Sequence, residues 1–341
     1  MRSFKQQHPV KPLAPAISRF IQLAALCFMA ALPVFTSAAA PKWPDRPIRI
    51  IVSQSPGGAS DMQARMISQP LAEALGQPVV IENKAGASGL IGAELAAKAA
   101  PDGYTILLFQ DVNTIFPSII GKLRHDPATS FDPITLVGTG PAVLLANSSS
   151  PINSVQELVD HSRKNPGSLS YAIAGVGTTQ HLALEVFQQR TGTKMTAIPY
   201  KGGGQAIVDV VSGQVPLAAL GVPPILTHVK AGTLKVLAVS GRARSPFLPD
   251  APTFLELGVP GLDDINQWNG FVVPAGTPPA IITRLHDEIV RIMGTPEILE
   301  KMKTIGMVPT TSPSPEDFKN LIARELERWP AVVKAAGIQP Q

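Results

Sequence analysis

The stretch IRIIVSQSPGGASD, residues 48–61, decides the fold, because it reads as a strand, a glycine turn and the start of a helix. Pro47 and the Pro-Gly-Gly break bracket a β-branched run typical of a buried strand. Ser60 or Asp61 is expected to cap a helix over 62–75. Such a turn directs free N–H groups to one point at the positive end of a helix dipole, which favours a carboxylate or phosphate. Many βα turns in α/β proteins look like this one without binding a ligand. A binding function is therefore inferred only if similar turns recur later in the chain.

The pattern of strand, glycine turn and helix occurs four times, twice in each half of the chain. The later turns lie at 83–89, 175–181 and 200–204. Further strands are expected at 79–82, 104–109, 134–137, 142–146, 169–174, 195–199, 216–221, 234–240 and 268–274, and helices at 90–100, 154–163, 182–191, 205–212, 224–231, 278–293, 296–304 and 315–336. Pro70 should kink or split its helix, and Pro330 should interrupt the last one.

This alternation predicts an α/β fold of two lobes, each a mainly parallel sheet flanked by helices. Lobe 1 is expected to comprise residues 40–141 and 268–341, and lobe 2 residues 142–267. Two crossing strands would join the lobes as a hinged clamp: the apolar double run at 134–146, with Gly138 and Gly140 inside it, and the strand at 268–274.

Residues 1–39 read as a secretory signal peptide. Basic residues precede an apolar run at 20–35, and small residues at 37–40 follow it, with cleavage expected after Ala39. The run is shorter than the ~20 residues of a comfortable membrane span. We therefore expect a periplasmic protein that has lost Cys27 with its leader.

The charge of the mature chain argues against nucleic acid as a partner. The whole chain has 29 Lys and Arg against 25 Asp and Glu, but four of the basic residues lie in the leader. The mature chain is therefore neutral and has no excess of basic residues for binding nucleic acid.

The mature chain has no cysteine, and ~300 residues can form a sufficient core without disulfides. We expect a monomer.

No constellation typical of catalysis, of a metal or of a cofactor stands out in the sequence. The loop 86–89 lacks the Gly-x-Ser-x-Gly spacing of a nucleophile elbow. Gln180 stands where a dinucleotide fingerprint needs a small residue, and Lys201 precedes its glycines, unlike a phosphate-binding loop. The mature histidines have no ligand-like spacing. We expect no catalytic residue, metal or cofactor, and keep an enzyme on the same scaffold as the alternative.

If the four turns face one cleft, the chain can hold a small anion from two sides. Main-chain N–H groups would make most contacts, without the desolvation cost of a buried ion pair. Lys84 and Lys201 could be counter-ions or solvated residues at loop edges. Asp61 would repel an anion, so we expect it to cap its helix or to accept from an ammonium or a water. The expected ligand-binding residues are Gly57, Gly58, Ala59, Ser60, Asp61, Ala87, Ser88, Gly89, Gln110, Thr178, Thr179, Gln180, Lys201, Gly202 and Gly203.

The chain after the leader resembles the Bug-type periplasmic solute receptors of tripartite tricarboxylate transporters. The strings that carry the resemblance are WPDRPI at 43–48, PGGASD at 56–61, GQPVVIEN at 76–83, PDGYT at 101–105, PYKG at 199–202, LPDAPT at 248–253 and PAGTP at 274–278.

The resemblance implies a two-lobed type II periplasmic binding protein that binds a small carboxylate for uptake through membrane permease subunits. By that analogy the turns at 57–61 and 86–89 take one carboxylate, and those at 178–180 and 201–203 close over the rest. A sensor that reports its ligand to a membrane kinase is the alternative.

Two places depart from the family pattern. Ala85 and Ser88 stand where the family usually has proline and glycine, and Gln-Asp-Val-Asn at 110–113 replaces a segment of small residues. Both places border the expected cleft, which leaves open a ligand that is not typical of the family.

Overall fold

The computed structural model describes residues 43–338, which form one compact unit. The expected signal peptide, residues 1–39 with Cys27, lies outside the described residues. The strands are β1 (Ile48–Val52), β2 (Val79–Asn83), β3 (Thr105–Gln110), β4 (Phe131–Pro141), β5 (Val143–Asn147), β6 (Ser170–Ile173), β7 (Thr196–Pro199), β8 (Leu217–Leu220), β9 (Leu234–Val239) and β10 (Asn266–Pro274). The helices are α2 (Ala59–Leu75), η1 (Ala87–Gly89), α3 (Leu90–Ala97), α4 (Val112–Ile119), α5 (Val155–Lys164), α6 (Thr179–Thr191), α7 (Gly203–Val211), α8 (Leu226–Lys230), α9 (Pro279–Met293), α10 (Pro296–Thr304) and α11 (Pro315–Ala335).

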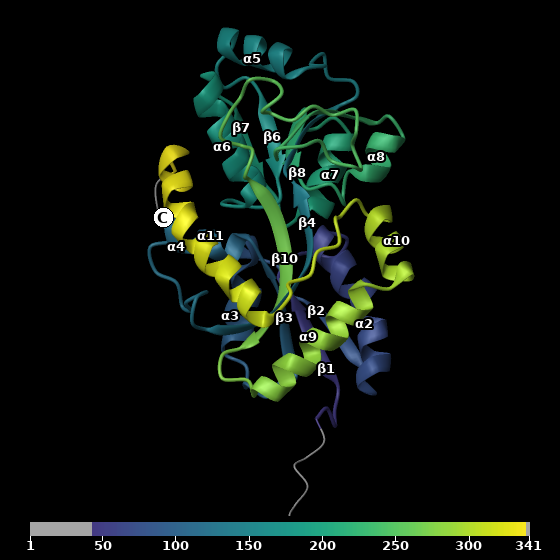
Figure 1. Cartoon of the computed structure of the whole chain (residues 1–341). Coiled ribbons are helices and arrows are strands. Elements are labelled where there is room, and N and C mark those ends of the chain that lie inside the picture. The colour runs from purple at the N-terminus through teal and green to yellow at the C-terminus, as the bar shows by residue number, and fades with distance from the viewer. Residues whose placement is uncertain (1–42, 339–341) are drawn as a thin grey trace, which may run out of the picture. The chain divides into compact units, whose positions relative to one another are not determined.

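The strands form two sheets of the same design (Figure 1). The sheet of lobe 1 has the order β2-β1-β3-β10-β4, and that of lobe 2 has the order β7-β6-β8-β5-β9. In each sheet only the fourth strand, β10 or β5, is antiparallel to its neighbours. The chain passes from lobe 1 into lobe 2 between β4 and β5 and returns through β10. This confirms the predicted α/β fold of two mainly parallel sheets joined by two crossing strands.

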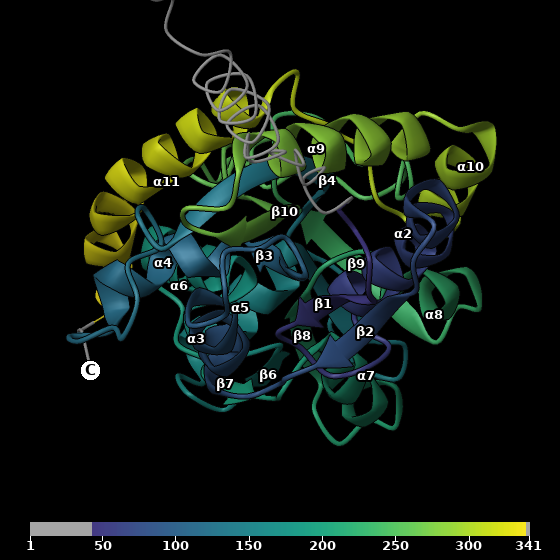
Figure 2. The ribbon, with the colours of Figure 1, turned by 90° about the horizontal axis from the view of Figure 1, so that it is seen from below.

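Each sheet is buried on both faces, because successive residues of its strands point to opposite helix layers. In β1, Ile50 packs with residues of α2 and α9, whereas Ile51 packs with residues of α3 and α11. In β5, Leu144 packs with residues of α6, and Leu145 packs with residues of α7 on the opposite face. Figure 2 shows α9 and α11 over β10 and β4.

The C-terminal helix α11 packs against both lobes. Phe318 and Ile322, near its start, join the cluster around Phe109 of lobe 1. Trp329 and Val333, near its end, join a cluster that also contains residues of α6 in lobe 2. The segment that the sequence assigned to lobe 1 therefore makes apolar contacts with lobe 2 as well.

The helix ends and prolines correct three sequence expectations. The prediction of Ser60 or Asp61 as N-cap is wrong: α2 begins at Ala59 with Gly58 as its N-cap. Pro70 and Pro330 lie inside helices that continue through them. Both prolines are at least partly exposed, so the carbonyl groups they leave unpaired can be hydrated while the opposite face stays packed.

Two further observations bear on the segments between the strands. The helix α4 was not anticipated, because no glycine turn precedes it and Pro117 lies inside it. Ser154 caps α5 and accepts the N–H of Glu157. Within residues 43–338 no helix has the length and apolar character needed to cross a membrane.

Candidate functional site

The four glycine turns lie in two facing pairs across the boundary between the lobes. Ser55, in the β1–α2 turn, donates its hydroxyl to the carbonyl of Lys201 at 3.3 Å. Ser88, after β2, lies against Gly175, after β6: a Cβ built on Gly175 would lie 2.7 Å from the Ser88 hydroxyl oxygen. Ser88 itself has a φ of +55°, a left-handed conformation that is uncommon for serine. The turns are thus in direct contact.

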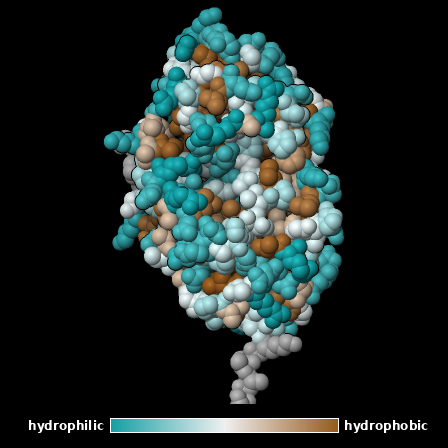
Figure 3. Space-filling view, in the orientation of Figure 1, coloured by the Kyte–Doolittle hydropathy of each residue, from teal (hydrophilic) through white to brown (hydrophobic). Residues whose placement is uncertain are grey.

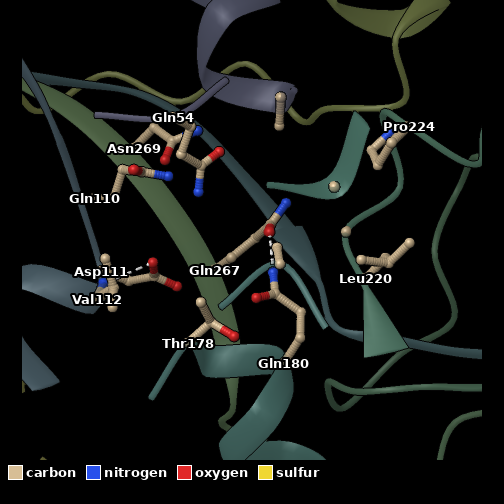
Figure 4. Close-up of a pocket in the computed structure, with 14 residues that line it drawn as sticks. Gln54, Gln110, Asp111, Val112, Thr178, Gln180, Leu220, Pro224, Gln267 and Asn269 are labelled. Atoms are coloured by element: carbon tan, nitrogen blue, oxygen red, sulfur yellow. Dashed lines mark hydrogen bonds between the residues drawn. The ribbon is translucent and has the colours of Figure 1, made fainter. Parts of the chain in front are cut away.

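A small cavity of about 30 Å³ lies between the lobes (Figure 4). Its volume suffices for water but not for an organic ligand. Six of its fourteen lining residues have neutral polar side chains, one is an acid, and none is Lys or Arg. The lining comprises Gln54, Ala59, Gln110, Asp111, Val112, Ala174, Thr178, Gln180, Gly203, Leu220, Gly221, Pro224, Gln267 and Asn269.

Some of the predicted site residues line this cavity, and others do not. Five line it: Ala59, Gln110, Thr178, Gln180 and Gly203. Three line two neighbouring hollows. Ala87 and Ser88 line an apolar groove of about 280 Å³. The same two residues and Lys201 line an opening of about 370 Å³. The other seven lie in the turns without lining the cavity: Gly57, Gly58, Ser60, Asp61, Gly89, Thr179 and Gly202.

Nine lining residues were missed by sequence reasoning. Asp111 and Val112 belong to the departure from the family pattern at 110–113, which marked this place. Gly221 was expected to end a strand, whereas the structure ends β8 at Leu220. Gln267 and Asn269 lie on the crossing strand β10, where the sequence gives no glycine turn to mark them. The missed residues are Gln54, Asp111, Val112, Ala174, Leu220, Gly221, Pro224, Gln267 and Asn269.

Asp61 is fully engaged within lobe 1. It is 3% exposed and accepts the N–H of Gly57 at 3.0 Å, the Nε of Arg65 at 3.0 Å and the Nδ2 of Asn83 at 2.9 Å. Burial alone would raise the pKa of Asp61, but these three donors outweigh it and hold the pKa below its usual value. An ionised Asp61 thus fixes the β1–α2 turn to β2.

Asp111 connects the two lobes. It caps α4, and its carboxylate accepts the N–H of Val112 at 2.8 Å and the hydroxyl of Thr179 in lobe 2 at 2.5 Å. Burial raises the pKa of Asp111 to about 7. The side-chain amide of Gln180, on α6 of lobe 2, also contacts that of Gln267, which lies on the crossing strand β10 in the sheet of lobe 1, as Figure 4 shows.

Gln110 belongs to a chain of hydrogen bonds in lobe 1. Its Nε2 donates to the Ser60 hydroxyl at 2.8 Å, which in turn donates to Gln54 at 3.5 Å. The Gln110 Oε1 atom is buried and has no hydrogen-bond partner among the described residues. This lining residue therefore has one unused acceptor.

The site as a whole can bind a small polar molecule. The first N–H groups of α2, α6 and α7 have no partner within their helices, and they lie where the lobes meet. Among residues 43–338 no three metal-binding side chains cluster. In Figure 3 the surface around the junction of the lobes is mostly pale or hydrophilic, with hydrophobic residues in separate patches.

Comparisons with known proteins identify the family. The model for the tripartite tricarboxylate transporter family receptor matches residues 63–338. BugT of Bordetella pertussis is 35% identical over 316 residues, which cover 91% of this chain and 95% of BugT.

Solved structures agree with this match. The periplasmic binding protein BugD aligns with a TM-score of 0.84 at 33% identity, over 88% of this chain and 100% of BugD. An R. palustris protein solved with adipate has a TM-score of 0.84 at 35% identity, over 88% of this chain and 100% of that one. MatC from Rhodopseudomonas palustris, with bound malate, has a TM-score of 0.79 at 29% identity, over 85% and 100% of the two chains. As its sequence indicated, the chain belongs to the receptor family of the tripartite tricarboxylate transporters.

Proposed function

We propose that this protein is an extracytoplasmic solute receptor that binds a small carboxylate between its lobes and delivers it to membrane permease subunits. The observation that carries the proposal is the meeting of glycine turns from both lobes at a polar cavity. Two relatives, solved with adipate and with malate, support the ligand class. The receptor would act in the periplasm as a monomer and would catalyse no reaction.

The physical basis is neutral stabilisation of an anion. N–H groups at the starts of α2, α6 and α7 are the positive ends of helix dipoles and can solvate a carboxylate. A lysine or arginine in the cavity would have to lose its own hydration first, which offsets much of the attraction. The absence of both from the fourteen lining residues fits this mode of binding.

Ligand entry requires that the lobes separate. A dicarboxylate does not fit into about 30 Å³, and the Asp111–Thr179 and Gln180–Gln267 contacts hold the cavity closed. The two chain crossings, between β4 and β5 and into β10, are the places where a hinge can bend.

The test begins with native mass spectrometry of the gently purified mature protein, to weigh any retained ligand, followed by calorimetry with a panel of small carboxylates. We expect at least one carboxylate to bind with one-to-one stoichiometry. Ser88→Trp should abolish this binding, because the indole would occupy the contact with Gly175.

Val208→Trp is the matched control. Val208 lies on α7 with 64% of its surface exposed, so the same indole there should leave affinity unchanged. Circular dichroism should show both variants folded. Unchanged affinity in a folded Ser88→Trp variant would show that the ligand binds elsewhere.

A further inference from the structure

We propose that the ligand carries an ammonium group as well as its carboxylate, and that Gln110 and Asp111 receive the ammonium. This inference rests on the proposed function and names the class of ligand: an amino acid rather than an unsubstituted dicarboxylate. The two residues are adjacent, at the carboxyl end of β3 and the start of α4.

The first observation is a buried acceptor without a donor. Gln110 is 6% exposed and lines the cavity, yet its Oε1 has no hydrogen-bond partner among the described residues. With the amide reversed, the Ser60 hydroxyl could donate to Oε1, but it would then lose its 3.5 Å bond to Gln54, and the Gln110 Nε2 would be left without its acceptor. An unpaired buried carbonyl costs about 1–3 kcal/mol, which a donor on the ligand would recover.

The second observation is that Asp111, an acid, has no cationic partner in the cavity lining. It is the one titratable side chain among the fourteen that line the cavity, and it is 6% exposed. A carboxylate offers about four acceptor positions, and the structure fills two of them, with Val112 and Thr179. The remaining positions face a cavity whose lining supplies no cation.

An ammonium has the chemistry that both groups lack. It brings three N–H donors and a positive charge that favours the ionised form of Asp111. A second ligand carboxylate at the same place would instead face Asp111 without a cation between them. Two other buried acids cannot take this part. The oxygens of Asp61 are engaged by Gly57, Arg65 and Asn83, and Glu325 does not line the cavity and pairs with Arg328 at 2.7 Å.

The test compares ligands of equal chain length by calorimetry: succinate, malate and aspartate; glutarate and glutamate; adipate and 2-aminoadipate. We expect the 2-amino member of the best-binding set to bind about tenfold more tightly than its unsubstituted partner, the effect of one hydrogen bond to a charged group. Asp111→Asn, which keeps the shape of the side chain, should reduce this preference to about twofold or less.

Thr179→Val separates recognition from closure of the lobes. It removes the hydroxyl that joins Asp111 to lobe 2 but leaves the carboxylate in place. If Asp111 recognises the ammonium, Thr179→Val weakens all members of a set equally and preserves the preference. If Asp111 only joins the lobes, Asp111→Asn also weakens all members equally, and the inference is overturned.

Two other outcomes are decisive. In the first, an unsubstituted or 2-hydroxy acid binds more tightly than the 2-amino acid of its set, and Asp111→Asn leaves that binding unchanged or improves it. This outcome would overturn the inference and leave the proposed function intact. Binding of none of the acids would overturn the proposed function and the inference with it. Should Asp111→Asn not fold, Gln110→Met supplies the same test, since it removes the free carbonyl oxygen and should also reduce the preference.

Discussion

The β1–α2 turn of lobe 1 and the β6–α6 turn of lobe 2 hold equivalent places in their sheets, and they are built alike. In each, a glycine with positive φ precedes the N-cap: Gly57 at +82° and Gly177 at +75°. In each, the N–H of that glycine donates to the side chain four residues on. Gly57 donates to Asp61 Oδ2 at 3.0 Å, and Gly177 donates to His181 Nδ1 at 3.1 Å.

The difference lies in the chemistry of the acceptor. His181 can accept through Nδ1 only as a neutral ring with its proton on Nε2, which lies 3.5 Å from Glu185. Asp61 is ionised and is balanced by Arg65, away from the cavity. The same backbone turn is thus fixed by charge in lobe 1 and by a neutral ring in lobe 2. The lobe 2 turn therefore keeps more of its helix dipole available to an anion.

Asp61→Ala should have the largest effect on this comparison. It leaves the Gly57 N–H and the Asn83 amide without their acceptor and removes the charge that balances Arg65. We expect a loss of about 3 kcal/mol in the free energy of unfolding, measured by urea denaturation. Arg65→Ala is the control: this residue is half-exposed, so its loss should cost less than about 1 kcal/mol. Equal costs would mean that Asp61 serves Arg65 alone.

The two glycines offer a matched pair for the second prediction. Their φ values are similar, so alanine at either position incurs a similar backbone strain of about 1 kcal/mol. Alanine at Gly57 meets no atom within 4 Å, whereas alanine at Gly177 meets the end of Ile119, on α4 of lobe 1. We expect Gly177→Ala to weaken ligand binding about thirtyfold, or roughly 2 kcal/mol, by obstructing closure, and Gly57→Ala to change it little. Calorimetry measures both.

Ile119→Val in the Gly177→Ala background provides the control for this mechanism, because it removes only the Cδ1 methyl group that a Cβ at position 177 would meet. This change should restore most of the affinity. If it does not, strain in the turn itself, and not contact between the lobes, determines binding.

How far the sequence anticipates this site depends on the kind of signal. Gln110, Thr178, Gln180 and Gly203 were expected because strands and glycine turns are local patterns, and ligands bind at the carboxyl ends of parallel strands. The Asp111–Thr179 bond joins residues 68 positions apart, and no local pattern encodes a contact that depends on how two lobes meet. The N-cap of α2 was misplaced for a related reason: Asp61 serves the turn and β2 from inside the helix.

His181→Ala should have a smaller effect than Asp61→Ala, since it removes a neutral acceptor. The Gly177 N–H loses its partner, and Glu185 keeps Tyr171 and Gln188 as donors. We expect a loss of about 1 kcal/mol in the free energy of unfolding. His181→Asn, which retains an acceptor oxygen, should recover part of it. A loss as large as that of Asp61→Ala would contradict the distinction between the charged and the neutral turn.

The pH dependence of the free energy of unfolding should show the smallest effect, because Asp61 changes its charge only at acidic pH. The pKa of Asp61 is lowered in the folded protein, so the unfolded chain takes up the proton first as pH falls. Asp61 therefore stabilises the fold above its unfolded pKa of about 4, and this contribution is lost as pH falls through the lower folded pKa. Asp61→Asn should flatten this part of the pH profile, measured as urea midpoints from about pH 6 downward, whereas Glu316→Gln, at an exposed residue, should not. If the urea midpoints of Asp61→Asn fall with decreasing pH as those of the unchanged protein do, the charge of Asp61 does not hold the lobe 1 turn.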